Sequence, residues 1–221
     1  MVKLYGAYRS RATRPLWLLE EIGMSFEYVP VLQAKRLDNP LDGDAPINTK
    51  SPAFLSINPM GTIPSLEDDG LVIHESLAIT LYLAKKYGGD LGPKDLAEDA
   101  QMLQWTLFAA TEIEATALKI SMALLGEQTE DVKATVEAAA LALARPFDML
   151  EQHFAGREWT VGNRFTTADI NLAEIVRYAQ PHAPLFVTRP GLKSWLERAQ
   201  ARPAFRKMWE TRLAEPASGP V

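Results

Sequence analysis

The N-terminal part of the chain carries short apolar runs around one helical pattern. Residues 2–5 alternate between apolar and polar positions, and residues 26–31 are rich in aromatic and β-branched types, as strands are. Between them, residues 14–23 place apolar side chains at helical spacing and end at Gly23. A strand, a helix and a strand in this order predict a parallel pair joined by a right-handed crossover.

The next segment predicts a long loop followed by a hairpin and a helix. Residues 32–52 are polar and rich in Asn, Asp and Pro, which indicates a long loop of the kind often tied to function. The apolar runs 63–67 and 71–74 are separated by a turn that contains the Asp-Gly pair 69–70, a strong hairpin signal. Helical spacing returns over residues 75–87 and ends at two glycines.

The second half of the chain predicts helices alone. Strand signals stop after a linker rich in glycine and proline at residues 88–94. Residues 214–221 have no apolar pattern to bury and are expected to form a loose tail. We therefore predict an α/β domain over residues 1–87 and an all-helical domain over residues 95–213. Helical patterns in the second domain cover residues 95–125, 129–154, 166–179, 190–199 and 203–213.

The amino-acid composition excludes several classes of protein function. A content of 47% hydrophobic residues in 221 supports a sizeable core, and the net charge of −5, with both signs interleaved, favours neither nucleic acid nor a membrane as partner. The absence of cysteine excludes disulfides, cysteine-ligated metals and a cysteine nucleophile. The three histidines show no metal-ligand spacing, so we expect no metal. Without a signal-peptide pattern or a long apolar run, we expect a cytoplasmic protein.

The most informative segment surrounds Ile63 and Pro64. Proline cannot donate a ladder hydrogen bond, so Pro64 fits the start of a strand better if the Ile63 backbone faces a ligand. A cis bond between them would expose the Ile63 N–H and carbonyl to a peptide-like ligand. Glu75 and Ser76 begin the following helix, where free N–H groups and a hydroxyl favour a carboxylate. Pro64 could instead merely end an edge strand, and Ser76 merely cap a helix.

Together these motifs and the helical second half resemble the cytosolic glutathione transferase family over nearly the whole chain. The resemblance implies a thioredoxin-like N-terminal domain, an all-α helical C-terminal domain, and glutathione as co-substrate. In that family the residue before a cis-proline pairs with the cysteinyl backbone of glutathione, a role that falls on Ile63 before Pro64. A Glu-Ser pair, here Glu75 and Ser76, holds the γ-glutamyl group. Lys50 matches a lysine that binds the glycine carboxylate, although its loop is longer and more acidic than usual.

Such an enzyme must favour the thiolate of glutathione, which a hydrogen bond donated to sulfur does. The first loop, residues 8–14, offers Tyr8, Ser10 and Thr13 as donors. Its sequence resembles the serine-type bacterial and plant phi-like enzymes, in which that serine contacts sulfur, so we expect Ser10 to be catalytic. Tyr8 is the alternative, because tyrosine-type members use a phenol from the same loop. Ser10 could also be a plain helix cap.

Other charged and polar positions carry structural expectations. Arg11 and Arg14 either add positive potential near sulfur or pair with surface carboxylates. The segment 163–170 resembles the family's capping segment: Thr166 and Asp169 stand at capping-box spacing, with Asp in place of Glu. We expect this segment to be structural.

The second substrate is expected to be a hydrophobic electrophile held in an apolar cleft between the domains. Candidate wall residues are Tyr8, Trp105, Phe108 and Tyr178, although a tryptophan at helical spacing is more often part of a core. The resemblance also implies a homodimer. The alternative function is a non-catalytic protein that binds apolar ligands on the same scaffold.

Overall fold

The computed structural model describes residues 1–216, which form two compact units. The N-terminal unit contains residues 1–89 and the chain from Pro203 onward, and the helical unit contains residues 90–202. The boundary falls inside the predicted linker, next to a short 3-10 turn, η2 (Gly89–Leu91). The last helix thus belongs to the N-terminal unit, whereas the sequence pattern had assigned residues 203–213 to the helical domain.

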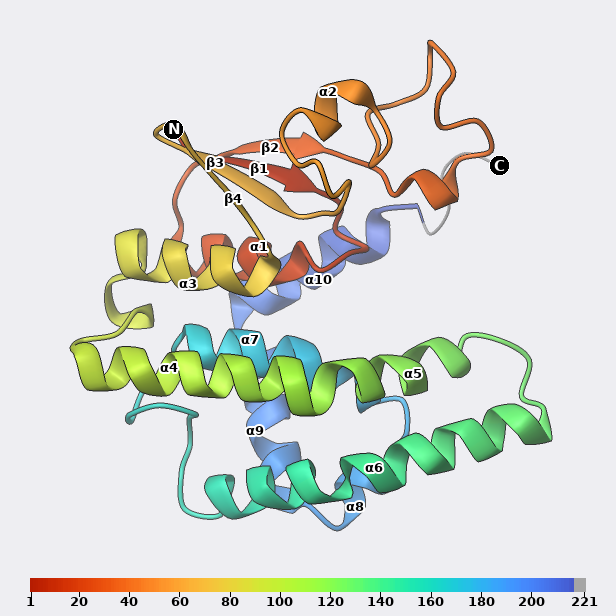
Figure 1. Ribbon diagram of the computed structural model, residues 1–221. Helices are drawn as coiled ribbons and strands as arrows, with labels where there is room; N and C mark the ends of the chain where they lie inside the picture. Colours follow the sequence, from red (N-terminus) through yellow and green to blue (C-terminus); the bar gives the residue numbers. More distant parts are fainter. Residues whose placement is uncertain (217–221) are drawn as a thin grey trace. The chain divides into compact units, whose positions relative to one another are not determined.

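The N-terminal unit is built on a four-stranded mixed sheet with strand order β2-β1-β3-β4 (Figure 1). β1 pairs with β2 in parallel, as the strand–helix–strand order predicts, and β3 pairs antiparallel with both β1 and β4. The turn between β3 and β4 has positive φ at Asp69 (50°) and Gly70 (84°), which matches the predicted tight hairpin. The strands are β1 (Lys3–Gly6), β2 (Glu27–Pro30), β3 (Ser65–Asp68) and β4 (Leu71–His74).

Helices cover both faces of this sheet. α1 (Thr13–Ile22) and α3 (Ser76–Tyr87) pack together on one face, and α2 (Pro52–Leu55) lies on the other (Figure 1). Phe54 of α2 forms a small core with Tyr5 and Val31. The predicted loop 32–52 contains some regular structure. It includes a 3-10 turn, η1 (Ala34–Arg36), and leads directly into α2.

The last helix, α10 (Pro203–Ala214), packs against α1. The rings of Trp17 and Phe205 meet edge to face with centroids 4.8 Å apart, and the Lys207 ammonium lies 2.6 Å from the Glu20 carboxylate. This packing explains why α10 belongs to the N-terminal unit. The helix pattern alone could not show which partner its apolar face would meet. The predicted tail is helical at its first residue, and its residues 217–221 lie outside the described chain.

The helical unit begins with one long helical stretch, as predicted, but a π-helical turn interrupts it. The stretch consists of α4 (Leu96–Phe108), the π turn η3 (Ala109–Glu114) and α5 (Ala115–Ala123). The short α8 (Pro184–Val187) was not predicted, because four residues are too few to show a helical period. None of the helices in residues 1–216 is both long and apolar enough to cross a membrane. The remaining elements are α6 (Glu130–Phe154), α7 (Thr167–Val176), η4 (Arg177–Ala179) and α9 (Pro190–Gln200).

Asp169 organises the start of α7. The predicted capping box is present, with the Asp169 carboxylate accepting from the Thr166 backbone N–H at 2.9 Å. Its other oxygen accepts from the backbone N–H of Thr160 at 2.8 Å and from the indole N–H of Trp195 at 2.9 Å. The side chain is fully buried, so one carboxylate joins three segments of the helical unit.

We predict that Asp169→Ala lowers the free energy of unfolding by about 3 kcal/mol, because it leaves several buried donors without an acceptor. Chemical denaturation measures this change. The control is Glu127→Ala, at an exposed position, which should stay within about 0.5 kcal/mol of the parent protein. Equal effects of the two substitutions would contradict the role assigned to Asp169.

Candidate functional site

The first loop connects β1 to α1 and places the Ser10 hydroxyl inside a tight turn. Ser10 Oγ donates to the Ala7 carbonyl at 2.6 Å and accepts from the Ala12 backbone N–H at 3.0 Å. α1 begins at Thr13 with Ala12 as its N-cap residue, so the interpretation of Ser10 as the helix cap is wrong. Ser10 is half-buried, and a rotation about its side-chain bond would release the hydroxyl from Ala7.

The other two hydroxyls of the first loop lie in different surroundings. Thr13 is fully buried, and its Oγ1 donates to the Ser10 carbonyl at 3.2 Å. Tyr8 is half-buried with its ring 5.3 Å from that of Tyr28. Burial, helped by nearby carboxylates, raises the pKa of Tyr8, so its phenol stays protonated at neutral pH.

Gly6, at the end of β1, has both Ala12 of the first loop and Pro64 as neighbours. A side-chain carbon added at Gly6 would lie 2.8 Å from Ala12 Cβ and 3.7 Å from Pro64 Cβ, so only glycine fits without displacement. The bond between Ile63 and Pro64 is cis, as predicted. The β1–β3 ladder begins with the pair of Tyr5 and Ser65, so the Ile63 backbone stands outside it.

Two asparagines shape the loops that carry Ile63 and Lys50. Asn58 is buried, and its amide donates to the Thr62 carbonyl at 2.8 Å, which closes the turn before Ile63. Asn48 is also buried, and its side-chain oxygen accepts from the Lys50 backbone N–H at 2.9 Å. Asn48 therefore fixes the Lys50 backbone, while the Lys50 side chain is exposed.

Gly61 joins these two loops. Its φ is +59°, and an added side-chain carbon would lie 2.6 Å from the Thr49 carbonyl oxygen. The turn before Ile63 and the segment that carries Lys50 are thus in direct backbone contact. Asn48, Asn58 and Gly61 were not predicted to shape the site; the Asn-Pro and Met-Gly pairs at residues 58–61 are the local sequence signal for a turn.

Glu75 and Ser76 stand at the start of α3. Glu75 is the N-cap residue with φ 68°, a conformation that costs a non-glycine residue about 1–3 kcal/mol and often occurs at functional sites. Ser76 is buried, and its Oγ accepts from Nη1 of Arg14 at 2.8 Å. Arg14 is only 1% exposed, so its interpretation as a surface ion-pair residue is wrong. It ties the first turn of α1 to the first turn of α3.

The predicted hydrophobic-substrate residues are divided between the two units, with Tyr8 in one and the other three in the helical unit. Trp105 is 8% exposed, and its ring lies 4.4 Å from that of His153 and 5.6 Å from that of Phe108. Tyr178 is half-buried beneath the Arg177 guanidinium. Phe108 borders a hollow of about 540 Å³ whose other lining residues are Glu112, Arg145, Pro146 and Met149.

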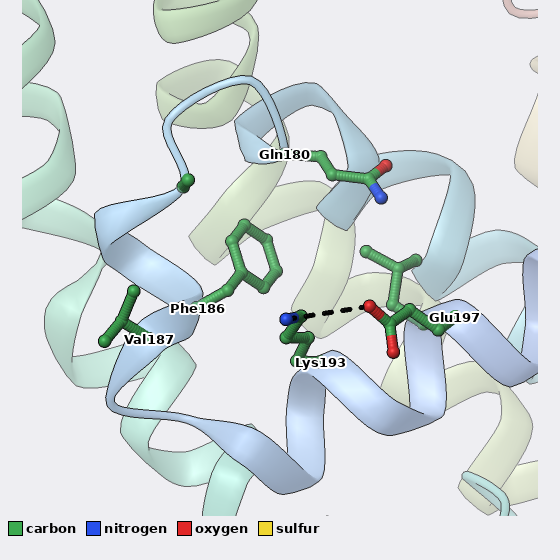
Figure 2. A pocket seen from close by; sticks show the side chains of 7 residues that line it. Gln180, Phe186, Val187, Lys193 and Glu197 are labelled. Atoms are coloured by element: carbon green, nitrogen blue, oxygen red, sulfur yellow. Dashed lines mark ion pairs between the residues drawn. The ribbon is translucent and has the colours of Figure 1, made fainter.

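A smaller hollow, of about 160 Å³, lies in the helical unit beside α8 and α9 (Figure 2). Phe186 and Leu196 contribute apolar surface, and the ammonium of Lys193 lies 3.8 Å from the carboxylate of Glu197. None of the predicted site residues lines it. Within residues 1–216, no cluster of three or more His, Asp or Glu side chains could hold a metal ion.

Comparisons with known proteins agree on one family. The family models for the glutathione S-transferase N-terminal and C-terminal domains match residues 8–86 and 113–203. Glutathione S-transferase 3 of Zea mays is 36% identical over 216 residues, which cover 93% of this chain and 92% of that protein.

Solved structures agree with the sequence comparisons. The crystal structure of glutathione transferase F7 from Populus trichocarpa has a TM-score of 0.80 at 29% identity, covering 96% of this chain and 99% of that one. Glutathione S-transferase I from mais, in complex with an atrazine glutathione conjugate, has a TM-score of 0.80 at 27% identity, covering 97% and 99%. The predicted architecture, a thioredoxin-like domain followed by a helical one, is thereby confirmed. The chain belongs to the glutathione S-transferase family.

Proposed function

We infer that the protein is a glutathione transferase that adds the sulfur of glutathione to a hydrophobic electrophile. Both family domains match, and a relative that bears this activity in its name is matched over 92% of its length, so the non-catalytic alternative is not favoured. One observation carries the site: Arg14 at the end of the first loop donates to Ser76 at the start of α3. Gly6 also lies beside both Ala12 of that loop and Pro64. The N-terminal unit thus gathers the proposed sulfur and peptide contacts by itself.

Glutathione binding is assigned to five positions. We propose that the Ile63 backbone before Pro64 pairs with the cysteinyl backbone, and that Lys50 binds the glycine carboxylate. Glu75 and Ser76 hold the γ-glutamyl group, where the free N–H groups and the positive end of the α3 dipole favour its carboxylate.

Catalysis is assigned to Ser10, which makes this a serine-type enzyme resembling the bacterial and phi-like members. Its hydroxyl rotates from the Ala7 carbonyl to donate to the glutathione sulfur, and the thiol proton leaves to solvent. The thiolate then attacks the electrophilic carbon: the S–C bond forms while the bond from that carbon to its leaving group breaks, and the leaving group departs with the electron pair as an anion that solvent takes up. Thr13 is less suited because it is fully buried, and Tyr8 is less suited because its ring packs against Tyr28.

The electrophile is proposed to be apolar and aromatic. The mais enzyme was solved in complex with an atrazine glutathione conjugate. In this chain, the aromatic candidate of the N-terminal unit is Tyr8, and those of the helical unit are Phe108 and Tyr178. Trp105 is mostly buried, and its ring packs against the ring of Phe108. We place the enzyme in the cytoplasm.

We also propose a homodimer, because large apolar side chains are exposed in both units. Leu103 and Leu107 on α4 are 47% and 53% exposed and lie four residues apart, on the same helical face. Met60 in the N-terminal unit is 80% exposed. A second copy of the chain would cover these side chains.

The catalytic assignment predicts that Ser10→Ala keeps its affinity for glutathione but loses about 100-fold in kcat, because the donor acts on the thiolate and not on the peptide. The pKa of the bound thiol, followed by the ultraviolet absorbance of the thiolate, should rise. The control Ser25→Ala, at an exposed serine beyond α1, should match the parent enzyme. An unchanged rate for Ser10→Ala would point to Tyr8 or Thr13 instead.

The contact between the two glutathione-binding loops predicts that Gly61→Ala weakens glutathione binding by about tenfold in Kd, equal to about 1.4 kcal/mol. The added carbon forces apart the segments that carry Ile63 and Lys50. Isothermal titration calorimetry measures the affinity. Gly43→Ala is the matched control, because a carbon added there meets nothing within 4 Å. Equal affinities would show that the two loops do not act together.

The dimer proposal predicts a sedimentation mass of two chains for the parent protein and of one chain for Leu107→Glu. The charge introduced on α4 would be buried without a partner in the interface. Leu125→Glu changes a leucine that is 78% exposed outside α4 and should leave the dimer intact. A parent protein that sediments as a single chain would contradict the proposal.

A further inference from the structure

The end of α10 lies against the first loop. Glu215 directly follows the last residue of α10. Its carboxylate accepts hydrogen bonds from two consecutive backbone N–H groups, those of Tyr8 at 3.0 Å and of Arg9 at 2.6 Å. Charge-assisted bonds of this kind are about twice as strong as neutral ones. Two adjacent N–H groups form a small anion-binding nest, and a side chain of this chain fills it.

Further hydrogen bonds join the first loop to the end of α10 and to Glu215. The Arg9 guanidinium donates from Nε to the Glu215 carbonyl at 2.6 Å and from Nη2 to the Leu213 carbonyl at 3.3 Å. Arg212 donates from Nη1 to the Tyr8 carbonyl at 2.6 Å. We call residues 212–215 the C-terminal latch, because they hold the backbone of the first loop on both its donor and acceptor sides.

The C-terminal latch rests on a fixed support. α10 is anchored to α1 by the ring contact of Trp17 with Phe205 and by the ion pair of Lys207 with Glu20. Because α1 follows the first loop directly, the latch and the loop share one rigid base. Glu215 itself is half-buried, which limits how far solvent screens its bonds.

We propose that Glu215 is a positioning residue, which fixes Tyr8 and Arg9 so that the next residue, Ser10, presents its hydroxyl to the glutathione sulfur. This inference rests on the proposed role of Ser10. The hydrogen bonds of the Ser10 hydroxyl are local, to Ala7 and Ala12, so they set its turn but not the place of the loop in the unit. The latch contributes to that placement from outside the loop, together with Arg36, whose Nη2 donates to the Arg9 carbonyl at 3.0 Å.

A role of Glu215 through its charge and a role through the position of Ser10 predict opposite changes in the pKa of the bound thiol. A negative charge near the proposed position of the sulfur would disfavour the thiolate, so if charge alone mattered, removing it would lower the pKa of the bound thiol. If Glu215 acts by positioning Ser10, removing it weakens the donor and raises that pKa. The direction of the change therefore separates the two roles.

The experiment compares Glu215→Ala with Glu210→Ala, which removes the same charge from an exposed position on α10. We expect Glu215→Ala to lose about 10-fold to 100-fold in kcat, since small displacements of a reacting group have effects of this size. The KM for glutathione stays nearly constant, and the pKa of the bound thiol rises. Glu215→Asp recovers part of the loss, and Glu210→Ala behaves as the parent enzyme. Circular dichroism confirms that each variant is folded.

A double-mutant cycle with Ser10→Ala completes the test, because Glu215→Ala should have little further effect on the thiol pKa once Ser10 is gone. A pKa that falls or stays constant in Glu215→Ala overturns the inference, as does an equal rise in the Ser10→Ala background. If Ser10→Ala itself leaves the thiol pKa unchanged, the proposed role of Ser10 fails and this inference with it. If only Glu215→Ala leaves the thiol pKa unchanged, the proposed role of Ser10 stands and this inference alone fails.

Discussion

The hydrogen bond from Arg14 to Ser76 is the interaction on which the proposed glutathione site depends. It is buried, it joins a full positive charge to a hydroxyl, and it connects the first turns of α1 and α3. The sulfur contact is proposed on the loop before α1 and the γ-glutamyl contact at the start of α3. One bond therefore sets the distance between the two ends of the proposed ligand, at the point where the α3 dipole is most positive.

Near this bond, neighbouring segments pack closely at two glycines. Gly6 allows Ala12 of the first loop to approach the end of β1, and Gly61 allows the turn before Ile63 to approach the segment with Lys50. Both positions are too close to their neighbours, Ala12 Cβ and the Thr49 carbonyl oxygen, for a side chain to fit without displacement. Glu75 at φ 68° adds conformational strain that the surrounding contacts must offset, which is common where a site is organised in advance of its ligand.

Much of this arrangement was predictable from local sequence signals. The Asp-Gly pair specifies its hairpin, Gly23 stops α1 with a φ of 71°, and the cis bond before Pro64 occurs where the proline stands at the start of a strand. Thr166 and Asp169 form their capping box at the expected spacing. These features depend on a few neighbouring residues, which is why a single sequence can indicate them.

What could not be predicted depends on contacts between distant segments. In the sequence, Arg14 looks like any surface arginine. Its partner Ser76, at the start of α3, is 62 residues away, so no local signal shows the contact. The apolar face of α10 is visible, but its partner α1 is not. Asn48 and Asn58 are ordinary loop residues until their amides are seen to close turns.

We propose that Ser10 stabilises the glutathione thiolate in a site held by the N-terminal unit. A crystal structure of the protein with glutathione bound tests this role most directly. We expect the sulfur within about 3.5 Å of Ser10 Oγ, a reach typical of hydrogen bonds to sulfur rather than to oxygen, with the cysteinyl backbone paired to Ile63. A sulfur seated against the Tyr8 phenol, with Ser10 Oγ still bonded to the Ala7 carbonyl, would contradict it.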